Sequence, residues 1–131
     1  MQVKGYQQLI AWQKAVALVT DIYRISSTFP REEVYGLTSQ LRRAAVSVPS
    51  NIAEGQGRAT TGEFVQFLCH ARGSLYEVET QILIGRNLGY MTLEQQESLI
   101  SSVTRVGRVL NGLITSLQKQ RQRARSLATS H

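Results

Sequence analysis

Apolar residues recur at steps of three and four along almost the whole chain, and no stretch alternates apolar and polar residues as a half-buried strand requires. This spacing predicts an all-α protein. Residues 9–29 carry two apolar seams side by side, so the first helix is apolar over a wider surface than one neighbouring pair of helices usually covers. Self-association of the chain and deep burial within the monomer both explain this width. The seams are Leu9, Trp12, Val16, Val19 and Tyr23, and Ala11, Ala15, Leu18, Ile22, Ile25 and Phe29.

Two prolines shape the first two helices. Pro30 ends the first helix, because a proline inside a helix loses a hydrogen bond and clashes with the preceding turn. A second helix begins near Gly36 and contains Pro49, so we expect a kink in it. Asn51 and Glu54 have the spacing that caps a restarted turn. The inward positions of this helix are Leu37, Leu41, Ala44, Val48 and Ile52.

Capping residues set the bounds of the third and fourth helices. Thr60 precedes Glu63 by the spacing of a capping box, and Gly89 supplies the left-handed position that ends such a helix. Thr92 and Gln95 repeat the capping spacing. Four helices with short links predict an antiparallel up-down-up-down four-helix bundle. Expected core positions are Phe64, Phe67, Leu68, Ala71, Leu75, Val78 and Ile82 in the third helix, and Leu99, Val103, Val106, Leu110, Leu113 and Leu117 in the fourth.

Glycines also fall inside the predicted helices, where each costs up to about 1 kcal/mol relative to alanine. Close helix–helix approach, within or between subunits, offsets that cost, and a local kink is the alternative. The four are Gly73, Gly85, Gly107 and Gly112.

The excess of positive charge lies in the last quarter of the chain. Net charge is +6 at pH 7, yet residues 1–97 hold equal numbers of cations and acids, while residues 98–131 hold six cations and no acid. After Leu117 the apolar seam fades and glutamines alternate with cations. We therefore expect a bundle over residues 1–118 and a basic, frayed or flexible tail over residues 119–131. The six cations are Arg105, Arg108, Lys119, Arg121, Arg123 and Arg125.

A segment of one charge sign concentrates phosphate oxygens near it, so nucleic acid is the natural partner to consider. On a continuous helix, Arg105, Arg108 and Lys119 project within about 60° of one another, at about 100° per residue. The alternative is that cations near a helix C-terminus only offset the macrodipole and keep the protein soluble.

The reactive side chains argue against an enzyme or a metal centre, both of which need convergent titratable groups. The histidines are His70 and His131, and neither completes the Glu-x-x-His motif of di-iron bundles. Cys69 and His70 diverge by about 100° on a helix, and Glu77 and Glu79 also diverge. We expect no catalytic residue, no metal and no cofactor.

The sequence also favours one compartment. No run of about 18 apolar residues is present to span a bilayer, so no membrane association is expected. A single cysteine excludes an internal disulfide and agrees with a reducing, cytoplasmic location.

The stretch Tyr35–Gly55, YGLTSQLRRAAVSVPSNIAEG, strongly resembles the signature of the four-helix-bundle proteins encoded by intervening sequences in bacterial 23S ribosomal RNA genes. Supporting matches are AWQKA at residues 11–15, ARGSLYEVETQIL at residues 71–83 and NLGY at residues 87–90. The resemblance implies an antiparallel four-helix subunit, assembly into a homopentameric barrel and no known enzymatic activity. It also implies kinship with the accessory variability proteins of diversity-generating retroelements, which bind nucleic acid and a reverse transcriptase.

Carried over by position, Arg42, Arg43 and Arg58 become candidates for a basic surface. Their alternative role is ion pairing with Glu54, Glu63, Glu77 or Glu79. The resulting hypothesis is a non-enzymatic, oligomeric nucleic-acid-binding scaffold that favours RNA, with a reverse transcriptase as a further possible partner. The competing hypothesis is a protein–protein interaction scaffold without a nucleic-acid role. The candidate nucleic-acid-binding residues are Arg42, Arg43, Arg58, Arg105, Arg108, Lys119, Arg121, Arg123 and Arg125.

Overall fold

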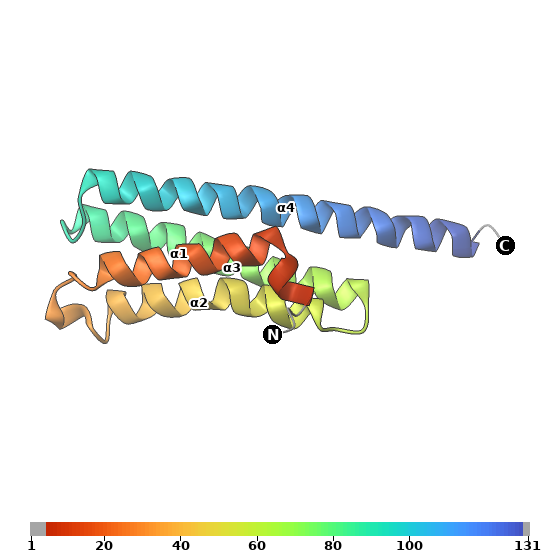
Figure 1. Ribbon diagram of the computed structural model, residues 1–131, viewed down its shortest axis with the longest axis horizontal. Helices are drawn as coiled ribbons and strands as arrows, with labels where there is room; N and C mark the ends of the chain where they lie inside the picture. The colour runs from red at the N-terminus through yellow and green to blue at the C-terminus, as the bar shows by residue number, and fades with distance from the viewer. Residues whose placement is uncertain (1–4, 130–131) are drawn as a thin grey trace.

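The computed structural model describes residues 5–129, and helices account for most of them. Successive helices pack against one another and the first packs against the last, which confirms the predicted antiparallel four-helix bundle (Figure 1). Short 3-10 turns, η1 (Gly5–Gln8) and η2 (Arg31–Glu33), precede the first and second helices. The four helices are α1 (Ile10–Ser26), α2 (Leu37–Gln56), α3 (Thr61–Asn87) and α4 (Leu93–Thr129).

The two apolar seams of α1 have different surroundings. Ala11, Ala15 and Ile22 of one seam are buried in the core. On the other seam, Val16 remains 36% exposed and Tyr23 remains 42% exposed. Leu9, Trp12 and Val19 of this second seam are partly buried and pack against the core, so burial within the monomer explains the first seam and much of the second. Val16 and Tyr23 form its exposed part.

The predicted inward positions of α2, α3 and α4 are buried or packed against the core, except Phe67, which lies at its edge. Val65 and Ile114 are also buried, although the apolar spacing did not single them out. The spacing missed these two residues because, in a helix of 3.6 residues per turn, two neighbouring rows of side chains can share one buried face.

Local capping chemistry is as predicted. Thr60 Oγ1 accepts a hydrogen bond of 3.1 Å from the Glu63 N–H at the start of α3. At the start of α4, the Thr92 N–H donates to Gln95 Oε1 (2.9 Å), and the Gln95 N–H donates to Thr92 Oγ1 (3.1 Å). Gly89 has a φ of +79°, which confirms its left-handed position after α3.

α2 runs through Pro49 as one continuous helix, so no restarted turn exists there. Asn51, predicted to cap such a turn, instead donates from Nδ2 to the Ser47 carbonyl oxygen (2.8 Å) and to Ser47 Oγ (2.9 Å). The side chain thus bonds back within the helix, as short polar side chains often do. The expected kink stays a prediction.

α1 ends at Ser26, four residues before the proline that was expected to end it. The hydroxyls of Ser27 and Thr28 donate to the carbonyl oxygens of Arg24 (2.6 Å) and Ile25 (3.0 Å). Such bonds compete with the helical ladder and favour a turn. Local polar side chains therefore end α1 before the steric effect of the proline acts.

The expectation that the helix frays after Leu117 is wrong over the described residues, because α4 continues to Thr129. The flexibility of the basic tail stays a prediction. Residues 118–129 contain neither proline nor glycine, and their glutamines, arginines and alanines are good helix formers. In Figure 1 the end of α4 projects beyond the other three helices. The division of the chain at residue 118 stays a prediction, and residues 130–131 lie outside the described part.

The helical glycines fall into two pairs. A Cβ on Gly85 or Gly107 lies 3.3–3.5 Å from neighbouring side chains, so close packing within the subunit occurs at these positions. Nothing lies within 4 Å of a Cβ on Gly73 or Gly112. Close approach inside the subunit therefore does not account for the second pair.

Candidate nucleic-acid interface

Four cations form a basic stripe on the outer side of α4. At about 100° per residue, Arg105, Arg108, Lys119 and Arg123 all project within about 60° of one another, and all four are exposed. Their 18-residue span covers about 27 Å of helix. Arg123 joins the predicted stripe because α4 remains helical to Thr129.

The remaining two cations of α4 face the other way. Arg121 and Arg125 line an open hollow of about 540 Å³ between the end of α4 and the start of α3. Arg121 continues the line of the buried seam, and its guanidinium Cζ lies 3.3 Å from the position of a Cβ on Gly62. Glycine at residue 62 therefore leaves room for the arginine. We call Arg121 and Arg125 the inner pair.

The structure gives Arg42 a role that the sequence did not predict. Its Nε donates to Ser26 Oγ (2.9 Å), and its Nη2 donates to the Tyr23 carbonyl oxygen (3.2 Å). Its guanidinium also lies over the Tyr23 ring, 4.5 Å from the centroid. Arg42 therefore caps the C-terminal end of α1, and we leave it out of the proposed interface.

Arg43 and Arg58 are exposed cations outside α4. The guanidinium of Arg58 lies over the Phe67 ring at 4.7 Å from the centroid, in the connection between α2 and α3. Among residues 5–129 one ion pair forms, between Asp21 and Arg24. The alternative role, pairing of these arginines with the glutamates of α2 and α3, is not seen among the described residues.

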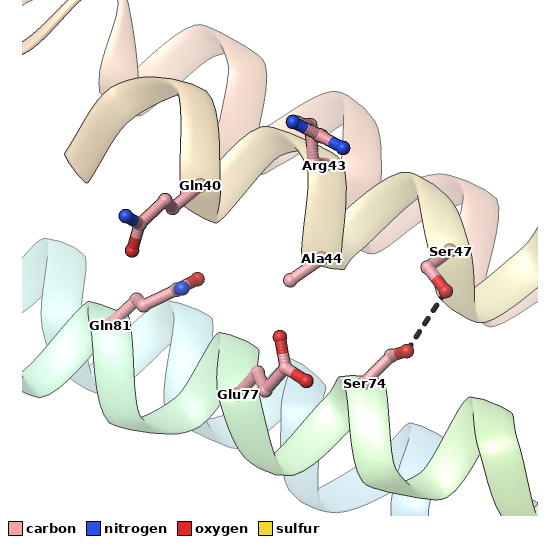
Figure 2. A pocket seen from close by; sticks show the side chains of 7 residues that line it. All are labelled: Gln40, Arg43, Ala44, Ser47, Ser74, Glu77 and Gln81. Atoms are coloured by element: carbon pink, nitrogen blue, oxygen red, sulfur yellow. Dashed lines mark hydrogen bonds between the residues drawn. The ribbon is translucent and has the colours of Figure 1, made fainter. Parts of the chain in front are cut away.

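Sequence reasoning missed a polar hollow of about 400 Å³ between α2 and α3. Figure 2 shows the carboxylate of Glu77 opposite the small side chain of Ala44, with the amide of Gln81 on one side. On the other side, Ser47 Oγ and Ser74 Oγ share a hydrogen bond of 2.9 Å. The lining residues are Gln40, Arg43, Ala44, Ser47, Ser74, Glu77 and Gln81.

The signal for this hollow was present in the sequence. Its residues come from the two longest stretches that carry the family resemblance, Tyr35–Gly55 and residues 71–83. Finding it required the antiparallel register of α2 and α3, which sets Ala44 opposite Glu77 and Ser47 opposite Ser74. Helical spacing within one segment carries no information about that register.

Other kinds of site are not evident in the described part of the chain. Residues 5–129 contain no cluster of three or more potential metal ligands. Arg72 Nη2 lies 3.8 Å from Cys69 Sγ, and Arg72 Nη1 donates to Asn111 Oδ1 (3.1 Å), so this arginine bridges α3 and α4. None of the described helices has the length and apolar character needed to cross a membrane.

Comparison with known proteins agrees with this architecture. A solved structure of a protein with unknown function from the S23 ribosomal protein family of Bacteroides thetaiotaomicron VPI-5482 superposes with a TM-score of 0.72 at 21% sequence identity. The match covers 80% of this chain and 98% of the other, and shows a shared fold. No curated protein matches significantly. The profile of the 23S rRNA-intervening sequence protein family matches residues 7–112, so the chain belongs to that family.

Proposed function

We propose that the protein is a non-enzymatic, oligomeric scaffold that binds nucleic acid, with RNA favoured. The description of its family names ribosomal RNA and no reaction. The observation that carries the proposal is the basic stripe, whose cations are exposed and form no ion pair within the described residues. Within this proposal the protein acts in the cytoplasm, the compartment that its single cysteine favours.

The stripe and the inner pair contact phosphates, and Arg43 and Arg58 add positive charge nearby. Arginine supplies a planar fork of donors that matches a phosphate group. The end of α4 lacks aromatic side chains for stacking, so contacts there are independent of base sequence. Gly112 lies between Arg108 and Lys119 with open space around it, which lets a polyanion approach the helix backbone closely.

We further propose that subunits assemble through the exposed seam of α1, in a pentamer as the resemblance implies. Val16 and Tyr23 are the exposed residues of this seam. Five copies multiply the excess charge of residues 98–131 fivefold in one particle. Such a particle has a field strong enough to hold an extended polyanion.

Gel-shift titration at two salt concentrations tests the proposal. Affinity for single-stranded RNA falls with salt, with a log–log slope of about −0.7 per neutralised phosphate. Truncation after Gln118 lowers both affinity and slope, and unchanged values in the truncated protein exclude a role for the end of α4. Light scattering on the same samples gives the number of subunits.

A narrower form of the proposal adds a reverse transcriptase docked on the assembly, as in the accessory proteins of diversity-generating retroelements. A neighbouring reverse-transcriptase gene with a template repeat favours this form. Location of the gene inside a ribosomal RNA gene favours the intervening-sequence form. Co-purification with the encoded reverse transcriptase is the direct test.

A second candidate function is a protein–protein interaction scaffold without a nucleic-acid role. The exposed seam of α1 favours it, because Val16 and Tyr23 leave apolar surface open to solvent there. In this case the end of α4 only keeps the protein soluble. Absence of any RNA or DNA retention at low salt supports this function over the first.

A further inference from the structure

We infer that the groove between α2 and α3 binds an unpaired guanine base, which adds base selectivity to the proposed RNA binding and rests on that proposal. The hollow around Glu77 continues into a second hollow of about 380 Å³ that shares Gln40, Glu77 and Gln81. The second hollow is also lined by Tyr76, Thr80 and Ile84. We call the two together the α2–α3 groove. Both hollows are open to solvent, so a base can reach the exposed carboxylate of Glu77.

The carboxylate of Glu77 selects the base. It is acceptor-only and forms no ion pair with an arginine. The Watson–Crick edge of guanine presents two adjacent donors, N1–H and the N2 amino group, which one carboxylate accepts together. Cytosine and adenine place an acceptor beside their amino group, and uracil flanks its one N–H with two carbonyl oxygens. A carboxylate therefore favours guanine over the other three bases.

Gln81 strengthens this selectivity. Its Oε1 is buried and has no hydrogen-bond partner within the protein. A buried acceptor without a partner costs free energy, so a ligand that supplies a donor is favoured. After a rotation of the Gln81 amide, the second hydrogen of the guanine amino group reaches this oxygen. Figure 2 shows the amide beside the Glu77 carboxylate on the same helix, α3.

Tyr76 and Arg43 complete the site. The Tyr76 side chain is 60% exposed at the edge of the groove, where its ring is free to stack on a base. Recognition of single-stranded RNA commonly combines such stacking with hydrogen bonds to the base edge. Arg43 lies on the rim, and Figure 2 shows its guanidinium directed away from Glu77. It is placed to contact the phosphate of the bound nucleotide.

Fluorescence anisotropy with two RNA octamers tests the inference. One is an all-uridine octamer, and the other carries a single central guanosine. The full chain binds the guanosine octamer about tenfold more tightly, the discrimination expected of one bidentate contact. Glu77→Gln abolishes this preference. Equal binding of the two octamers by the unchanged protein overturns the inference and leaves general RNA binding intact.

Glu79→Gln is the matched control, because it removes the same charge from an exposed position two residues along α3 and outside the groove. Both variants change the affinity for the all-uridine octamer equally, and only Glu77→Gln loses the preference for guanosine. Loss of the preference in both variants attributes it to net charge and overturns the inference. Thermal unfolding verifies that each variant is folded.

A titration with free nucleotides separates this inference from RNA binding by α4. Guanosine monophosphate shifts the amide NMR signals of the α2–α3 groove, and uridine monophosphate does not. This difference persists even if neither octamer binds, and Glu77→Gln removes it. If no octamer binds and guanosine monophosphate shifts no groove signal, both the RNA proposal and the guanine site are excluded.

Discussion

The phenol of Tyr90 donates a hydrogen bond of 2.9 Å to Oε2 of Glu33, which joins the α3–α4 connection to the turn before α2. The other carboxylate oxygen, Oε1, accepts from the Leu37 N–H at 3.2 Å and so satisfies one free donor at the start of α2. The Tyr90 ring also packs on Phe29, with ring centroids 5.5 Å apart. Glu33 thus ties the α1–α2 connection to the α3–α4 connection at one end of the bundle.

The hydrogen bond to Glu33 raises the pKa of Tyr90 above its ordinary value of 10.0, and burial and the negative charges of Glu33 and Glu32 act in the same direction. A raised pKa in the folded state means that this group stabilises the protein below pH 10 and that the contribution is lost as pH rises through the folded value. We expect the free energy of unfolding of the unchanged protein to fall more steeply above pH 10 than that of the Tyr90→Phe variant. Urea unfolding between pH 8 and pH 11 measures both, and parallel curves for the two proteins contradict the prediction.

Gly55→Ala and Gly73→Ala, made separately, have opposite effects on the free energy of unfolding. A Cβ on Gly55 lies 2.7 Å from Phe67 Cβ and 2.9 Å from Phe64 Cδ1, so Gly55→Ala forces α2 and α3 apart and costs about 1–3 kcal/mol. Gly73→Ala meets nothing within 4 Å and raises stability by about 0.5–1 kcal/mol. Chemical denaturation of both variants measures this. A stabilising Gly55→Ala disproves the close approach.

Adjacent arginines of α2 differ in their effect on folding. Arg42→Ala removes the donors to Ser26 and to the end of α1, where Ser26 is only 2% exposed, and lowers stability by about 1–2 kcal/mol. Arg43→Ala is the control, because Arg43 is exposed and the change stays within about 0.5 kcal/mol. Equal effects of the two substitutions on the unfolding midpoint contradict the capping role.

Removal of two stripe cations changes the salt dependence of RNA binding. Each cation that contacts a phosphate contributes about −0.7 to the log–log slope on single strands, so Arg105→Gln with Arg108→Gln makes the slope shallower by about 1.4. Arg24→Gln with Arg31→Gln removes the same charge outside α4 and leaves the slope unchanged. A slope that shifts equally in both double variants shows that net charge, and not the stripe, sets affinity.

A structural feature could be predicted from the sequence when its cause lies within a few neighbouring residues, and could not when the cause is a contact with another helix. The capping pair Thr92 and Gln95 and the left-handed Gly89 were found because their chemistry lies within a few residues. The end of α4 was misjudged because a fading apolar seam indicates the loss of a packing partner, not the loss of helix. The role of Arg42 depends on a contact with Tyr23 from another helix, which no spacing within α2 encodes.

Acidic and basic side chains are distributed unevenly along the long axis of the subunit. Glu32, Glu33 and Glu94 lie at the end of the bundle opposite the projecting end of α4, which carries Arg123 and Arg125 (Figure 1). Arg31 lies in the same turn as Glu32 and Glu33 and offsets part of their charge, so the electric dipole moment along the long axis arises mainly from the cations at the end of α4. A nearby polyanion exerts a torque on that dipole and turns the projecting end toward itself before any side chain makes contact. The lengthwise dipole thus selects the direction of encounter, and the rate of association falls with ionic strength as the affinity does.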